Sequence, residues 1–219
     1  MSKSQKNVRR AAVSALRAWS KGHVYADTLV ERHSHRNHLS QADRGLLNSI
    51  ILSVLRHRRL LDHWIGLLRK GKLDHETRDV LRVGLSQLLI LGIADHAAVN
   101  ETVECARMPV RGLINAVLRR AISGRKRLLR DIEDLSPAIR YSHPDWMWNR
   151  WKKEYGVEPA TALMAWNNDP APNFLRLNPL KPADPDFANE PVIDHPGFLQ
   201  IDGPVPTAFL DAGHGYITD

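Results

Sequence analysis

The last residues of the chain have the spacing of a nucleotide-binding loop. Two apolar residues and an aspartate precede Gly213-x-Gly215, as in many sites that bind S-adenosylmethionine (SAM) or a dinucleotide. Such a loop needs a helix that begins directly after it and presents free N–H groups to the ligand. Only four residues follow Gly215, and Tyr216–Thr218 favour a strand. We therefore interpret both glycines as turn residues beside an exposed edge and predict no cofactor-binding residue in this chain.

Nucleophilic and metal-binding side chains are few. Cys105 is the only cysteine, which excludes an internal disulfide and a cysteine-rich zinc site. Its place in the helical stretch VECARM favours packing over a nucleophilic role. His33, His35 and His38 lie close together, but no further ligands follow at a fixed spacing, so we predict a polar loop. The sequence therefore predicts no catalytic residue and no metal site.

Basic residues gather in clusters that suit contact with RNA. Arginine has a planar fork that pairs with phosphate oxygens and stacks on unpaired bases. Near the end of a helix, however, a cation is favourable without any ligand, so both interpretations stay open for the second and third clusters. The first cluster lies on or before the first predicted helix and consists of Lys3, Lys6, Arg9, Arg10 and Arg17. The second lies near the end of a later helix and consists of Arg119, Arg120, Arg125, Lys126, Arg127 and Arg130. The third lies at a helix junction and consists of Arg56, Arg58 and Arg59.

The net charge of +7 is divided unevenly along the chain. Residues 1–130 hold 25 Lys and Arg against 10 Asp and Glu, a net +15, whereas residues 131–219 hold 6 against 14, a net −8. This asymmetry predicts two domains with different partners. The basic domain would attract phosphate backbones at long range. No long apolar run or signal peptide is present, so we predict a cytoplasmic protein without a membrane partner.

Apolar periodicity gives the elements that must position these residues. Residues 5–125 read as a series of amphipathic helices, in which the almost wholly apolar residues 80–92 form the buried central helix. Ser40 and Asp95 are predicted helix caps. Beyond residue 130, two helices precede short alternating runs among prolines, including TAFLD and GYITD. The predicted fold is mainly α, with an all-α bundle over residues 1–130 and a small α+β subdomain over residues 131–219.

Several stretches resemble a known family. Residues 43–65, 81–107 and 111–120 resemble the NusB-like helical domain, although Asp95 stands where that family often has proline. This domain occurs alone as an antitermination factor and also at the N-terminus of the RsmB/Sun family of rRNA cytosine-5 methyltransferases. Residues 140–156 and 167–178 resemble the segment that follows it in RsmB, which a lone NusB does not have.

The resemblance implies that the arginine-rich first helix contacts RNA and that Arg176 borders an RNA-facing subdomain. It also implies that the chain is the N-terminal portion of a methyltransferase, without the catalytic domain and inactive alone. The intact protein would use SAM to methylate C5 of a cytosine in small-subunit rRNA. The alternative is a NusB-like interaction module that binds a protein partner or forms a homodimer.

Overall fold

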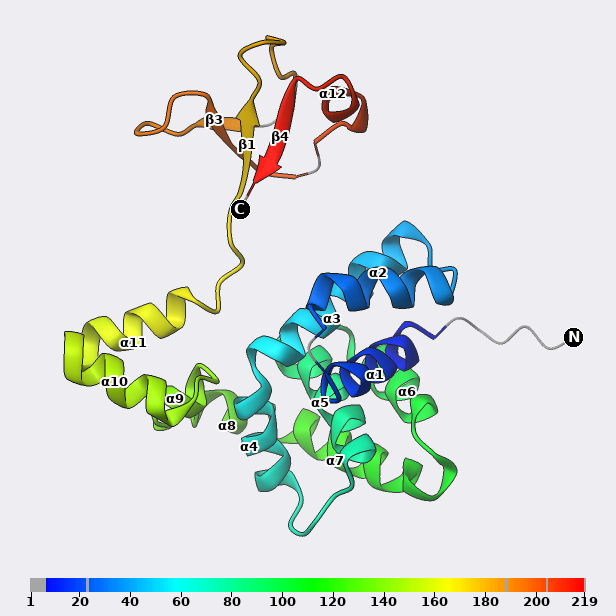
Figure 1. The fold of residues 1–219 in the computed structure, drawn as a ribbon. Coiled ribbons are helices and arrows are strands. Elements are labelled where there is room, and N and C mark those ends of the chain that lie inside the picture. The colour runs from blue at the N-terminus through cyan, green and yellow to red at the C-terminus, as the bar shows by residue number, and fades with distance from the viewer. Residues whose placement is uncertain (1–6, 23, 188, 204, 219) are drawn as a thin grey trace, which may run out of the picture. The chain divides into compact units, whose positions relative to one another are not determined.

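The computed structural model describes residues 7–22, 24–187, 189–203 and 205–218 (Figure 1). Lys3 and Lys6 therefore lie outside the described residues. The chain divides into two compact units between Asn168 and Asp169. The charge and the apolar pattern of the sequence predict this division between residues 130 and 131 instead. The difference arises because the helices that follow residue 130 belong to the same compact unit as the bundle.

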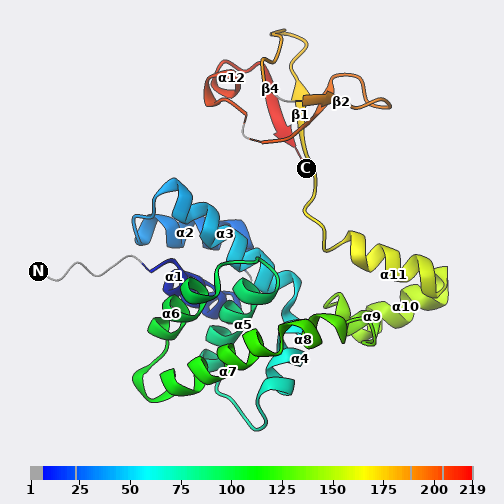
Figure 2. The same ribbon diagram turned by 180° about the vertical axis from the view of Figure 1, so that it is seen from behind.

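The first unit contains a helical bundle (Figures 1 and 2). Its elements are α1 (Val8–Trp19), α2 (Ala26–Arg36), α3 (Gln41–Arg56), α4 (Arg58–Leu68), α5 (His75–Leu89), α6 (Asp95–Cys105), the 3-10 helix Met108–Val110, α7 (Arg111–Ser123) and α8 (Arg125–Arg130). Every residue from Asp79 to Leu89 on α5 is buried. α5 packs against α1, α3, α4, α6 and α7, so the predicted central helix is confirmed, although it begins at His75 and ends at Leu89 rather than spanning residues 80–92.

Side-chain caps fix where several of these helices begin. Asn7 accepts the backbone N–H groups of Arg9 and Arg10 at the start of α1, and Ser40 accepts that of Asp43 at 3.2 Å, as predicted. The prediction for Asp95 is wrong. Asp95 is the first residue of α6 and makes no capping hydrogen bond, because its carboxylate pairs with Arg125 on α8.

Three further helices complete the first unit: α9 (Pro137–Arg140), α10 (Asp145–Tyr155) and α11 (Val157–Trp166). They are fastened to the N-terminus of α4. Nη2 of Arg59 donates to both carboxylate oxygens of Asp145, at 3.0 and 2.9 Å. The N–H of Leu60 donates to Oγ of Ser142 at 3.1 Å. These contacts explain why the compact unit extends well past residue 130.

The second unit is a four-stranded antiparallel sheet with one short helix. Its elements are β1 (Asn173–Leu177), β2 (Asn189–Pro191), β3 (Phe198–Ile201), α12 (Thr207–Asp211) and β4 (Gly215–Thr218), in the sheet order β2-β3-β1-β4. Leu175, Leu199 and Ile201 form its core, and Phe209 and Leu210 pack against them from α12. TAFLD is therefore a helix rather than an extended run, and the mainly α prediction with a small α+β region is confirmed.

The terminal glycines serve strand pairing. Gly213 has a φ of +75° in the turn before β4, a conformation that favours glycine. A Cβ on Gly215 would lie 2.9 Å from Cδ1 of Leu175 and 3.1 Å from the carbonyl oxygen of Arg176. Because β4 follows directly, no helix presents N–H groups to a ligand here. The turn interpretation is therefore confirmed for Gly213, whereas Gly215 is the first residue of β4.

Candidate nucleic-acid interface

The arginines of α1 already have partners within the bundle. Nε of Arg9 donates to Oε1 of Gln87 at 2.8 Å, and Nη2 of Arg10 donates to the carbonyl oxygen of Glu104 at 3.2 Å. Arg17 lies 3.5 Å from the carboxylate of Glu76. Arg10 and Arg17 remain exposed, and their remaining N–H groups can face a ligand. Arg9 is half-buried and chiefly ties α1 to α5.

The second basic cluster is divided by the fold. Arg125 is half-buried and paired with Asp95, and Lys126 is exposed on α8. Three of the other arginines line one groove of about 430 Å³ beside α4, α7 and α8. Figure 2 shows how these three helices are arranged. The side chains that line this groove, called here the arginine groove, are Leu67, Leu68, Ala116, Arg119, Arg120, Ser123 and Arg127.

Hydrogen bonds hold two of these arginines without neutralising them. Nε of Arg119 donates to Oδ1 of Asn115 at 3.1 Å, and Nη1 of Arg120 donates to the carbonyl oxygen of Leu68 at 3.2 Å. Within the described ranges, no carboxylate lines the groove and Arg119, Arg120 and Arg127 form no ion pair. A guanidinium has five N–H donors, so each retains donors for a ligand. An anion bound here would relieve the repulsion among three like charges.

Two arginines of the third cluster, Arg58 and Arg59, have structural partners. Arg58 lies over the ring of Trp19, with its Cζ 5.1 Å from the ring centroid. Burial, reinforced by the positive charge of Arg82, lowers the pKa of Arg58. Arg59 holds Asp145, as described above. These two arginines therefore stabilise the bundle and its junction with α10.

Arg176 stands in a different electrostatic setting. It is exposed on β1, opposite Phe198 and Tyr216 in the register of the sheet, and its Cζ lies 6.0 Å from the centroid of the Phe198 ring. Residues 169–219 contain 2 Lys and Arg against 8 Asp and Glu, a net −6. Contact of Arg176 with RNA stays a prediction, because its own unit does not attract phosphate.

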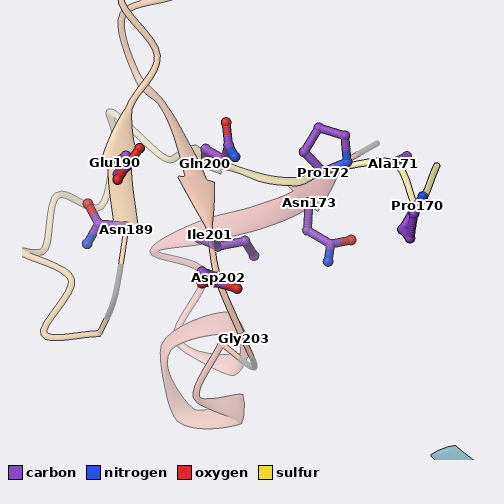
Figure 3. Close-up of a pocket in the computed structure, with 10 residues that line it drawn as sticks. All are labelled: Pro170, Ala171, Pro172, Asn173, Asn189, Glu190, Gln200, Ile201, Asp202 and Gly203. Carbon is purple, nitrogen blue, oxygen red and sulfur yellow. The ribbon is translucent and has the colours of Figure 1, made fainter. Parts of the chain in front are cut away.

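A concavity of about 540 Å³ lies at one end of the sheet (Figure 3). Its polar lining consists of the amides Asn173, Asn189 and Gln200 and the carboxylates Glu190 and Asp202. Because these carboxylates are acceptors with negative charge, they disfavour a phosphate ligand. The described part of the chain contains no group of three His, Cys, Asp or Glu side chains arranged to hold a metal ion.

Cys105 and the histidines have structural settings. Sγ of Cys105 donates to the carbonyl oxygen of Glu101 at 3.1 Å, and burial raises the pKa of the thiol to about 12. A thiol of this kind does not supply a thiolate nucleophile at neutral pH. His33 and His35 lie on α2 rather than in the predicted polar loop, since α2 extends to Arg36.

Sequence reasoning missed the residues that complete the arginine groove. None of Leu67, Leu68, Ala116 and Ser123 was predicted as a site residue, although the spacing of Ala116, Arg120 and Ser123 places them along one side of a helix. That signal was present in the sequence. The contribution of Leu67 and Leu68 was not, because it depends on how α4 packs beside α7.

Two stretches of the chain match the models of known protein families. Residues 6–123 match the model of the NusB family, and residues 143–190 match the model described as Methyltr_RsmF/B-like, ferredoxin-like domain. Among the described residues, no helix is both long and apolar enough to cross a membrane.

Two curated relatives share one name. "Ribosomal RNA small subunit methyltransferase B" of Escherichia coli O1:K1 / APEC is 30% identical over 234 residues, which cover 99% of this chain and 53% of that protein. The protein of the same name from Escherichia coli O9:H4 (strain HS) is 33% identical over 184 residues, covering 80% of this chain and 42% of that protein. The chain spans about half the length of the curated relatives it matches.

A solved structure shares the fold. The crystal structure of PH0851 aligns with a TM-score of 0.59 at 16% sequence identity, covering 100% of this chain and 54% of that one.

Proposed function

Because the chain belongs to the NusB family, and because its relatives are named as methyltransferases of small-subunit ribosomal RNA, we propose that it binds that RNA and positions it for methylation. The proposed reaction is transfer of a methyl group from SAM to C5 of a cytosine. No residue of this chain is assigned to the chemical step or to holding SAM.

The observation that carries the proposal is the arginine groove. Three arginines face one groove without an ion-pair partner among the described residues, in a unit that holds 29 Lys and Arg against 16 Asp and Glu, a net +13. RNA phosphates supply the negative charge that this surface lacks, and Arg pairs with phosphate oxygens through two N–H groups at once. Arg10 and Arg17 on α1 offer additional exposed donors.

Replacement of the groove arginines tests this function. The variant Arg119→Gln, Arg120→Gln, Arg127→Gln should bind a small-subunit rRNA hairpin at least about tenfold more weakly at low salt. The slope of log K against log salt should become shallower by about 2, since three phosphate contacts are lost. Fluorescence anisotropy with a labelled hairpin measures both quantities.

A matched control removes the same charge elsewhere. Arg32, Arg36 and Arg44 are exposed on α2 and α3, away from the groove, so their replacement by Gln should weaken RNA binding far less. Equal losses in the two triple variants would show that only the overall charge matters. Binding of a protein partner or self-association, without affinity for RNA, would favour the interaction-module alternative instead.

A further inference from the structure

We propose that the arginine groove holds a single unpaired nucleotide of the RNA, with its base against the apolar side chains and the phosphates of this nucleotide and its neighbours on the arginines. This inference rests on the proposed RNA-binding function and goes further, because it assigns a preferred RNA structure to one place on the molecule.

The apolar part of the groove favours an unpaired nucleotide over a duplex as the ligand. Leu67 is 56% exposed and lines the same groove as the three arginines, together with Leu68 and Ala116. The backbone of a duplex presents phosphates and sugars, which would leave these apolar groups without a matching surface. An unpaired base has apolar faces that pack on side chains and on guanidinium planes.

The size of the groove fits one nucleotide rather than an extended strand. Its volume of about 430 Å³ lies in the range of sites that enclose one small molecule. Oγ of Ser123 donates to the carbonyl oxygen of Arg119 at 3.1 Å, and its oxygen can still accept a hydrogen bond from the sugar or base.

The groove is built on elements that are held in place. On the other side of α7, Ile114, Val117, Leu118 and Ala121 are buried in the bundle core. The hydrogen bond from Arg120 to the carbonyl oxygen of Leu68 joins α7 to the C-terminal end of α4. Ligand binding therefore requires little ordering of the backbone, which lowers its entropic cost.

Three hairpins with the same stem, each closed by a non-nucleotide linker so that no loop base is present, test the inference. One is fully paired, one has a single-nucleotide bulge, and one has an abasic residue at the bulge. The chain should bind the bulged hairpin at least about fivefold more tightly than the other two, since one stacked base contributes that much or more. The abasic hairpin keeps the extra phosphate but lacks the base. The difference in affinity between the abasic and the bulged hairpin therefore measures the contribution of the base. Anisotropy titrations at one fixed salt concentration give the three affinities.

Leu67 supplies the variant that leaves the charge unchanged. Leu67→Ser should remove the preference for the bulged hairpin while binding to the paired hairpin stays the same. Leu129→Ser is the matched control, because Leu129 is 40% exposed on α8 and does not line the groove. Circular dichroism checks that both variants fold.

The outcomes separate the inference from the function on which it rests. Equal affinity of the chain for the three hairpins would overturn the nucleotide assignment and leave RNA binding intact. A preference for the bulge that survives in Leu67→Ser would also overturn it. Failure to bind any hairpin at low salt would contradict the proposed function itself.

Discussion

At the scale of single residues, the partner of each arginine decides its role. Arg82 is buried between the carboxylates of Asp62 and Asp79, each 2.7 Å away, and these partners raise its pKa against the opposing effect of burial. Arg125 is paired with Asp95. Arg127 has a similar sequence context but lines a groove without a carboxylate. Residue type alone therefore did not separate structural arginines from candidate ligands for phosphate.

The buried imidazole of His33 predicts a dependence of stability on pH. His33 is 5% exposed, and burial, together with the positive charges of Arg36 and Arg32, lowers its pKa from 6.5. Below about pH 6.5 the unfolded chain therefore binds a proton that the folded protein resists, so the free energy of unfolding falls as the pH decreases. Above that pH the imidazole is neutral in both states and the effect disappears.

Denaturant unfolding at about pH 7.5, 6.5 and 5.5 measures this effect. The His33→Asn variant should lose less of its unfolding free energy between the highest and lowest pH than the unaltered chain. If both lose the same amount, His33 is not one of the groups that titrate on unfolding.

At the scale of elements, the crossing of α5 and α7 depends on a glycine. A Cβ at Gly84 would lie 2.7 and 2.9 Å from the two Cδ atoms of Leu118 and 3.1 Å from Cγ2 of Thr102. Leu118 and Thr102 are fully buried, so neither side chain has free space to move into. Gly84→Ala should therefore lower the free energy of unfolding by about 1–3 kcal/mol, as overpacking in cores does.

Gly66 provides the matched control for that prediction. It lies within α4, and a Cβ there meets nothing within 4 Å. Gly66→Ala should raise the free energy of unfolding by about 0.5–1 kcal/mol, because alanine favours a helix more than glycine does. Thermal or urea unfolding measures the stability of both variants. A higher free energy of unfolding for Gly84→Ala than for the unaltered chain would contradict the close crossing of α5 and α7.

The helices were largely predictable, because apolar side chains repeat at helical spacing from α1 to α7. The NusB resemblance is confirmed by the family match over residues 6–123. Short elements were less predictable. TAFLD forms α12 because Phe209 and Leu210 pack on the sheet core, a contact that local alternation does not reveal. The prediction that Asp95 caps a helix was wrong because its ion-pair partner, Arg125, lies 30 residues further along the chain, where local sequence patterns do not reveal it.

At the scale of the whole molecule, charge is sorted between the two units. Residues 1–168 carry a net +13 and residues 169–219 a net −6. We therefore propose that the first unit supplies the long-range attraction for RNA and that the second adds Arg176 within an acidic setting. The asymmetry of charge could be read directly from the sequence. The boundary at Asn168 could not, because it depends on the contacts of Arg59 and Leu60 with residues 142–145.

The central claim is that this chain binds RNA through its basic unit, and one titration tests it most directly. The affinity for a small-subunit rRNA hairpin and for a scrambled hairpin would be measured between about 50 and 200 mM salt. With three phosphates held, the affinity should fall more than about tenfold across that range. A higher affinity for the rRNA hairpin would place sequence recognition in this chain. Absence of binding to either hairpin at the lowest salt concentration would contradict the claim.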